Sequence, residues 1–296
     1  MTKCTLLLTV VMLGATPALR AQMPRTQQPQ PPPHVQQDVP YAAVGGRALL
    51  LDIYQPGEPR SDLQPAVVLL HGGGWTSYDK SAMREVGIFL ARAGFVAFAV
   101  DYRLMKGNEN LWPAQLDDAQ RAVRWIRAHA GKYGVDRDRI GAFGYSAGGQ
   151  LAALLGLEDT RDNSDPALAR YSSRVVAVVD ISGPSDFTTN RDAESDAFLT
   201  TFFGGDYVQK GDIWRDASPV FHISRKAAPF LIVHGIRDAN VPFAQAQELC
   251  DKLKQARVHV EFLKLDEGHD FESPDSYKRL TQETRNFLAQ YLRLGN

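Results

Sequence analysis

Residues 140–149 read IGAFGYSAGG, and this stretch decides the fold. An apolar run ends at Phe143, and the residues after Gly149 have the composition of a helix, so the motif Gly-x-Ser-x-Gly lies between a predicted strand and a predicted helix. That is the context of a nucleophile elbow, in which side chains two residues either side of Ser146 would collide unless both were glycine. The serine hydroxyl would stand clear of the backbone at a helix N-terminus, where developing negative charge is favoured. The alternative is a glycine-rich turn with an incidental serine.

Predicted strands and helices alternate on both sides of this motif. Apolar runs rich in β-branched residues predict strands at 49–54, 65–70, 95–100, 140–143, 175–181, 230–234 and 259–263, and apolar periodicity predicts helices between most of them. Such alternation predicts an α/β fold with a mostly parallel central sheet and helices on both faces. Within the long helix that Trp112-Pro113 opens, the charged residues are expected to form a solvated face; they are Asp117, Asp118, Arg121, Arg124 and Arg127.

Residues 188–219 interrupt the alternation after the sixth parallel-type strand. They contain aromatic residues among aspartates and glycines. One interpretation is a small lid-like insertion over the strand ends, where ligands bind in such sheets. The other is an irregular surface loop packed by its own aromatic side chains.

The N-terminal segment predicts export. Residues 1–21 have an early lysine, a short apolar run and small residues near Ala21, as in a secretory signal peptide. Residues 22–38 are rich in glutamine and proline and predict an extended linker, which leaves residues 39–296 as the folded domain. We therefore expect a secreted or periplasmic protein with no membrane span in its mature form. Cys250, on an amphipathic helix, is expected to be a buried small hydrophobe.

Composition sets the broad class. The chain has 296 residues, of which 44% are hydrophobic and 23% charged, which is typical of a globular protein. Its net charge of −1 gives no electrostatic basis for nucleic-acid binding. Nothing in the sequence indicates an oligomeric state.

A serine nucleophile requires a base, and the base requires an acid that orients it. Of the 7 histidines, His269 has the best placement, because it lies in a loop directly after the last predicted strand. Asp238 follows the preceding strand and completes the chain order serine, acid, histidine. Asp180 and Asp186, which also lie near a strand end, are the competing acids.

The glycine run at residues 72–74 predicts an oxyanion hole. It follows a strand, and its lack of Cβ atoms lets the backbone approach a substrate. The backbone N–H groups of Gly73, Gly74 and Ala147 are the predicted donors. A phosphate-binding loop is the alternative, but the run lacks the lysine and the serine or threonine of a Walker motif.

These motifs together resemble the HGGG-type esterases of the α/β-hydrolase fold. The residues that carry the resemblance are His71-Gly72-Gly73-Gly74-Trp75, Asp101-Tyr102-Arg103-Leu104, Gly144-Tyr145-Ser146-Ala147-Gly148-Gly149, Asp238 and His269. The chain is similar to hormone-sensitive-lipase-like esterases and more closely to BD-FAE-type feruloyl and acetylxylan esterases, over residues 39–296. Kynurenine formamidases share much of the pattern.

The resemblance implies ester hydrolysis through an acyl-serine intermediate, with no metal and no cofactor. It implies a small-molecule or polysaccharide-linked ester as substrate, with Trp75 and Tyr145 lining its pocket, although either could equally be a core residue. Asp101-Tyr102-Arg103 would support the elbow. Unlike hormone-sensitive-lipase-like members, the chain has no large N-terminal cap helix. An arylformamidase- or peptidase-like amide hydrolase and an inactive binding domain are the alternatives.

Overall fold

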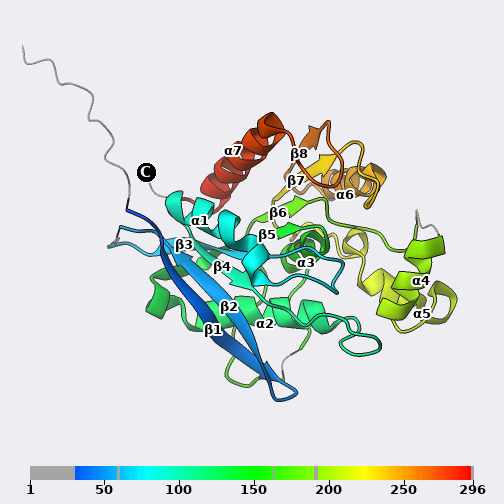
Figure 1. Cartoon of the computed structure of the whole chain (residues 1–296), viewed down its shortest axis with the longest axis horizontal. Coiled ribbons are helices and arrows are strands. Elements are labelled where there is room, and N and C mark those ends of the chain that lie inside the picture. Colours follow the sequence, from blue (N-terminus) through cyan, green and yellow to red (C-terminus); the bar gives the residue numbers. More distant parts are fainter. Residues whose placement is uncertain (1–30, 59–60, 163, 190–192, 295–296) are drawn as a thin grey trace, which may run out of the picture. The chain divides into compact units, whose positions relative to one another are not determined.

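A single eight-stranded sheet forms the centre of the described chain (Figure 1). The computed structural model describes residues 31–58, 61–162, 164–189 and 193–294. The strands are β1 (His34–Val44), β2 (Arg47–Gln55), β3 (Gln64–Leu70), β4 (Val96–Val100), β5 (Val135–Tyr145), β6 (Val178–Ile181), β7 (Phe230–Gly235) and β8 (Val260–Leu265). Their order is β1-β2-β4-β3-β5-β6-β7-β8, antiparallel from β1 to β4 and parallel thereafter. The predicted mostly parallel sheet is confirmed.

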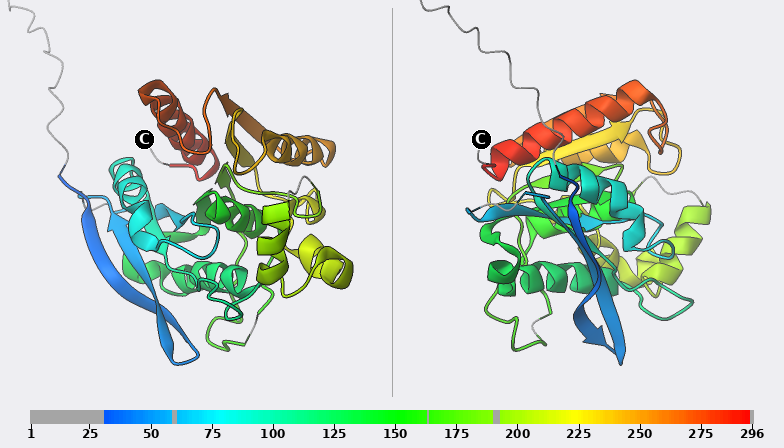
Figure 2. Two further views of the ribbon diagram at one scale, coloured as in Figure 1. Left: turned by 45° about the vertical axis from the view of Figure 1, so that its right-hand side comes forward. Right: turned by 60° about the vertical axis from the view of Figure 1, so that its left-hand side comes forward.

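Helices cover both faces of this sheet, as the alternation predicts. They are α1 (Arg84–Arg92), α2 (Ala114–Ala128), α3 (Ala147–Leu157), α4 (Ala193–Phe202), α5 (Tyr207–Asp216), α6 (Phe243–Gln255) and α7 (Pro274–Tyr291), with short 3-10 helices η1 (Lys80–Met83), η2 (Ala130–Tyr133) and η3 (Pro219–Phe221). One core cluster joins α1 and α7 to the sheet, and a second joins α2, α3 and α6 to its other face (Figures 1 and 2). Cys250 is buried on α6, as predicted.

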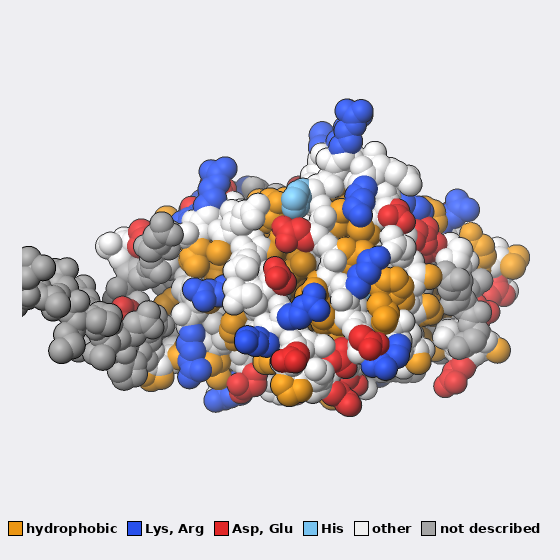
Figure 3. Space-filling view, turned by 90° about the horizontal axis from the view of Figure 1, so that it is seen from above, with side chains coloured by type: hydrophobic (Ala, Val, Ile, Leu, Met, Phe, Trp, Pro, Cys, Tyr) orange, Lys and Arg blue, Asp and Glu red, His pale blue; other side chains and the backbone are white. Residues whose placement is uncertain are grey.

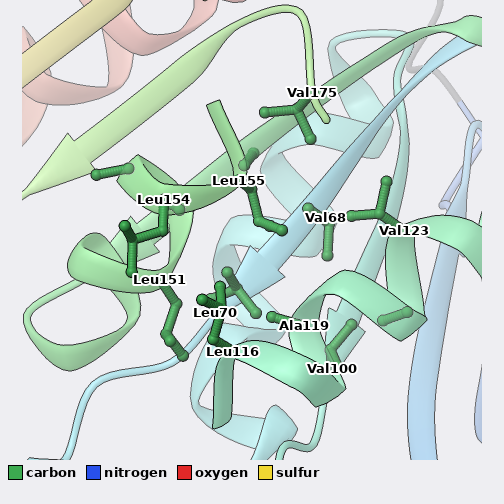
Figure 4. Close-up of a cluster of buried hydrophobic side chains, with 14 of the residues drawn as sticks. Val68, Leu70, Val100, Leu116, Ala119, Val123, Leu151, Leu154, Leu155 and Val175 are labelled. Carbon is green, nitrogen blue, oxygen red and sulfur yellow. The ribbon is translucent and has the colours of Figure 1, made fainter. Parts of the chain in front are cut away.

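The larger cluster lies between the central strands and the helices α2 and α3. Every residue of β3 is buried, as its uninterrupted apolar run indicates. Figure 4 shows side chains of β3 and β4 meeting those of α2 and α3 in this cluster; among those labelled are Val68, Leu70, Val100, Leu116, Ala119, Val123, Leu151 and Leu155. Because α3 begins directly after Ser146, this packing fixes the serine relative to the sheet.

The folded domain begins earlier than the sequence suggests. We predicted a linker over residues 22–38, but β1 begins at His34 and pairs with β2, with Val35 opposite Tyr54. Backbone pairing needs no apolar side chain, so a polar composition does not exclude a strand at the edge of a sheet. The predicted signal peptide (1–21) and linker residues 22–30 lie outside the described residues.

The charged residues of α2 do not form the solvated face that we expected. Asp118, Arg121 and Arg124 are all buried. Asp118 pairs with Arg121 and with Arg103, while Arg124 donates hydrogen bonds to backbone carbonyl groups, including that of Leu168. The loop after α3 covers this side of α2 and supplies those acceptors. These buried charged groups therefore have protein partners, although Arg124 Nη2 has none among the described residues.

The interrupting segment at residues 188–219 contains α4 and α5, so it is helical and not an irregular loop. It follows β6, the sixth strand in the chain and the fourth in its parallel part. Figures 1 and 2 show its two helices together at one side of the sheet. Its aromatic rings pack on one another and on Trp75, whose ring centroid is 4.7 Å from that of Phe202. A lid-like function for the segment stays a prediction.

The face of the molecule seen in Figure 3 has mixed charge. In the space-filling view of Figure 3, lysine and arginine side chains are interspersed with aspartate and glutamate, and neither sign gathers into a continuous patch. This agrees with the net charge of −1. Among the residues that the structure describes, no helix has the length and apolar character needed to cross a membrane.

Candidate active site

The turn between β5 and α3 has the conformation of a strained elbow. Ser146 has φ 54° and ψ −120°, a combination that non-glycine residues rarely adopt. Its backbone N–H donates to the Ile181 carbonyl at 2.8 Å, which ties the turn to β6. A Cβ atom at Gly144 would overlap the Gly148 carbonyl, and one at Gly148 would overlap the Leu70 carbonyl. The expected steric need for glycine is therefore present at both positions.

Three predicted side chains meet at this turn. The Ser146 Oγ lies 3.0 Å from His269 Nε2, and His269 Nδ1 lies 2.8 Å from Asp238 Oδ2. The histidine and the aspartate come from loops after β8 and β7, so parallel strands bring all three to one edge of the sheet. An ionised carboxylate only accepts, so Nδ1 carries the hydrogen and Nε2 of the neutral ring is free to accept from the serine hydroxyl.

The Asp238 carboxylate is held in its charged form. Its side chain is fully buried, which disfavours ionisation. The carboxylate nevertheless accepts hydrogen bonds from His269 and the backbone N–H of Val241, and His234 Nε2 lies 3.3 Å from Oδ2. These bonds hold the pKa of Asp238 well below its usual range. The group that orients His269 is therefore a carboxylate throughout the pH range in which histidine titrates.

The competing acids lie elsewhere. Asp180 Oδ1 accepts from the backbone N–H of Gly183 at 3.1 Å, and Asp186 accepts from Thr188 and Thr189. Neither carboxylate has a hydrogen bond to His269 in the described residues. Burial raises the pKa of Asp180 to about 6, although the nearby His234 lowers it in part. The geometry thus favours Asp238 over Asp180 and Asp186 as the acid that orients His269.

Asp180 should make stability fall as pH rises. Its folded-state pKa of about 6 lies above the 3.8 of an ordinary aspartate, so between these values the folded chain holds a proton that the unfolded chain releases. Asparagine does not titrate. We therefore expect the free energy of unfolding of Asp180→Asn, measured relative to that of wild type, to rise by about 2–3 kcal/mol as the pH goes from 4 to 7. Urea unfolding at both pH values measures this, and parallel pH curves for the two proteins would contradict it.

The glycine run lies beside the serine. A Cβ atom at Gly72 would be 3.3 Å from that of Ser146. Gly73 and Gly74 have φ 103° and 57°, and within the described ranges no protein acceptor takes a hydrogen bond from their N–H groups or from that of Ala147. The Tyr102 hydroxyl donates to the His71 carbonyl at 2.7 Å. The Asp-Tyr-Arg run therefore supports the glycine loop more directly than the elbow.

Gly73→Ala should damage both the loop and the activity. Its new Cβ would overlap the Ser77 carbonyl, and φ 103° suits glycine alone. Because Gly73 is a predicted oxyanion donor, we expect kcat on p-nitrophenyl acetate to fall by about 10²- to 10³-fold. Gly134→Ala is the control, since Gly134 also has positive φ, at 65°, but open space around it. Equal activity of the two variants would argue against a role for the loop.

Trp75 and Tyr145, the two residues predicted to line the substrate pocket, both make contacts within the protein. Trp75 is buried, donates to Gln150 Oε1 at 3.2 Å and stacks on rings of the inserted segment. The Tyr145 hydroxyl donates its one hydrogen to Asp270 Oδ1 at 2.5 Å, and its oxygen also lies 3.2 Å from the His269 carbonyl oxygen. Tyr145 thereby holds the loop that carries the histidine. Substrate contact by either residue stays a prediction.

His234 is the functional candidate that the sequence interpretation missed. It is fully buried, and its Nε2 lies 3.3 Å from Asp238 Oδ2. The signal that the sequence offered is position: His234 lies near the end of β7, four residues before Asp238 in the loop that follows this strand.

Among the described residues, no group of three or more histidine, cysteine, aspartate or glutamate side chains could hold a metal ion.

A family model described as BD-FAE matches residues 51–253. The chain is 32% identical over 255 residues to esterase LipC of Mycobacterium tuberculosis, a match that covers 83% of this chain and 62% of LipC. This chain thus spans less than two thirds of LipC. Its matches to LipM and LipQ of the same organism cover 51% and 56% of those proteins.

Solved structures share the fold over nearly the whole described chain. A truncated carbohydrate esterase from gut microbiota has a TM-score of 0.74 at 25% identity, covering 90% of this chain and 100% of its own. Esterase 2 of Thermogutta terrifontis, phosphonylated by sarin, has a TM-score of 0.76 at 26% identity, covering 92% and 99%. The same esterase with butyrate bound has a TM-score of 0.74, covering 90% and 96%.

Proposed function

Because this chain belongs to the BD-FAE family and has the α/β-hydrolase fold, we propose that it is a serine carboxylesterase acting through an acyl-serine intermediate. The observation that carries the proposal is the continuous line of hydrogen-bond distances from Ser146 through His269 to Asp238, at 3.0 and 2.8 Å. Such a line activates a hydroxyl that is a weak nucleophile by itself.

Acylation begins at the serine. The Ser146 hydroxyl proton passes to His269 Nε2 as the oxygen bonds to the carbonyl carbon of the ester. The positive ring that results is stabilised by the buried Asp238 carboxylate, which accepts the Nδ1 hydrogen. His269 then gives the proton to the alcohol oxygen, the carbon–oxygen bond breaks, and the alcohol leaves.

The charge that develops on the carbonyl oxygen needs fixed donors. The N–H groups of Gly73, Gly74 and Ala147 are the proposed set, because they are not used in bonds to the described protein and their loop passes beside Ser146. Deacylation repeats the chemistry with water: His269 takes a proton from water, the resulting hydroxide attacks the acyl carbon, and Ser146 recovers its hydrogen as the acid leaves.

For the substrate, we propose short-chain or aromatic acyl esters, including feruloyl or acetyl esters of plant polysaccharide. The support is the kinship with a carbohydrate esterase and with an esterase solved with butyrate bound. The inserted aromatic helices against Trp75 add a compact wall near the glycine loop, which suits small acyl groups better than long chains.

A substrate panel tests the proposal. It comprises p-nitrophenyl acetate, butyrate and decanoate, methyl ferulate, acetylated xylan, N-formylkynurenine and a prolyl peptide. We expect kcat/KM to be highest on an acetate, butyrate or ferulate ester and at least about 100-fold lower on both amides. A higher kcat/KM on an amide would overturn the ester assignment in favour of amide hydrolysis, and a preference for decanoate would overturn the short-chain assignment.

We propose a secreted or periplasmic location, supported by the composition of residues 1–21. Expression of the full chain with a C-terminal tag, followed by cell fractionation and N-terminal sequencing, tests it. Cleavage near Ala21 in the exported fraction is expected, and an intact N-terminus in the cytoplasm would overturn it.

A further inference from the structure

His234 is buried at the end of β7, where it contacts the loop that carries the acid. It has 0% exposure, and its Nε2 lies 2.9 Å from the Val241 carbonyl and 3.3 Å from Asp238 Oδ2. A carbonyl has no hydrogen to give, so Nε2 carries the hydrogen and is the donor. One N–H group therefore faces both ends of the 238–241 loop.

That contact adds to the hydrogen bonds that the carboxylate accepts. Asp238 Oδ1 accepts from the backbone N–H groups of Asn240 and Val241, each at 2.9 Å. Asp238 Oδ2 faces His269 Nδ1 at 2.8 Å and His234 Nε2. The backbone bonds fix one oxygen, and His234 approaches the oxygen that orients His269.

The surroundings of the ring leave it little freedom to move. The ring of Phe243 meets it edge to face, with centroids 6.0 Å apart. The second ring nitrogen, Nδ1, is buried and has no hydrogen-bond partner among the described residues. If the side chain at position 234 served only to fill space, an apolar residue would suit the site better, because it would leave no buried nitrogen without a hydrogen-bond partner. The histidine is therefore better explained by the contacts of its Nε2.

We propose that His234 is a positioning residue for the esterase reaction: its Nε2–H holds Asp238 Oδ2 and the Val241 carbonyl in place, so that the carboxylate keeps His269 directed at Ser146. The inference rests on the proposed function. It assigns His234 no contact with substrate. Small displacements of a catalytic group cost large factors in rate, so the expected effect lies in kcat.

The test compares His234→Gln with His234→Asn. Glutamine places its amide near the position of Nε2, whereas asparagine reaches only as far as Nδ1, so the two variants are matched in polarity and differ in the donor. With p-nitrophenyl acetate we expect His234→Asn to lower kcat by about 10- to 100-fold with KM within twofold, and His234→Gln to recover most of the loss. Equal kcat for both variants and wild type would overturn the inference.

A double-mutant cycle separates positioning from general stability. In an Asp238→Asn background, His234→Asn should change kcat by less than about threefold, because the group through which it acts is already lost. A full 10- to 100-fold loss in that background would show that His234 acts by another route and would overturn the inference.

A spectroscopic measurement covers the case in which the histidine variants do not fold. In labelled wild-type protein, the Nε2–H of His234 should give a proton resonance protected from exchange, and Asp238→Asn should shift it. An unshifted resonance would overturn the inference. If the wild-type protein neither hydrolyses p-nitrophenyl acetate nor reacts with a fluorophosphonate, the proposed function fails, and this resonance still reports on the contact independently.

Discussion

Ser146→Ala is expected to lower kcat on p-nitrophenyl acetate by about 10⁵- to 10⁶-fold, because it removes the oxygen that attacks the carbonyl carbon of the ester. A fluorophosphonate probe, which bonds to an activated serine oxygen, should label the wild-type protein and leave the variant unlabelled. The phosphonylated esterase from Thermogutta terrifontis makes this class of probe a reasonable choice. Mass spectrometry of the labelled peptide identifies the residue.

Ser182→Ala is a matched control for that experiment. Ser182 also follows a strand directly, has positive φ at 51°, is buried, and has an Oγ without a partner among the described residues. It differs in having no contact with His269, so its variant should keep its labelling and its turnover. Equal labelling of wild type and Ser146→Ala would exclude Ser146 as the nucleophile.

Asp238→Asn is expected to lower kcat by about 10⁴-fold with little change in KM. The asparagine amide can present hydrogens to His269 Nδ1, which favours the tautomer whose Nε2 carries a hydrogen and cannot accept one from Ser146. The backbone fold would survive, so far-ultraviolet circular dichroism should change little. The thermal midpoint should fall, because the contacts that hold the pKa of Asp238 below its usual range stabilise the folded state and are lost in the variant. Steady-state kinetics at pH 7 to 9 provide the measurement.

Asp180→Asn and Asp186→Asn are the controls, since each removes the charge of a competing acid. Neither carboxylate has a hydrogen bond to His269 in the described part of the chain, so both variants should keep turnover within about threefold of wild type. Loss of turnover in either of them, together with an active Asp238→Asn protein, would transfer the role of acid to that residue.

The sequence predicted the elements of the site well because its requirements are local. A tight turn demands glycine two residues either side of Ser146, and parallel strands bring the loops that follow them to one edge, whatever fills the rest of the core. The motif order and the placement after strands were therefore enough to select Asp238 and His269, which the structure brings together with Ser146.

The errors arose where long-range contacts decide. The charged side chains of α2 are buried because the loop after α3 covers them. The spacing of polar and apolar residues within α2 gives no information about which distant segment packs on the helix. The start of β1 depends on backbone pairing with β2, to which side-chain polarity is a poor guide. The contact of His234 with the Asp238 carboxylate depends on how the chain turns after β7, and the sequence does not specify that turn.

The stacking of Trp75 on the inserted helices has a consequence for how members of this family diversify. Trp75 stands directly after the glycine run, and its far side rests on Phe202. Exchanging the 188–219 segment for that of a relative would therefore also remove the support beside the glycine run at residues 72–74. Grafting experiments in this family should treat Trp75 and the insertion as one inherited unit, and natural changes in acyl preference should appear as paired replacements across that interface.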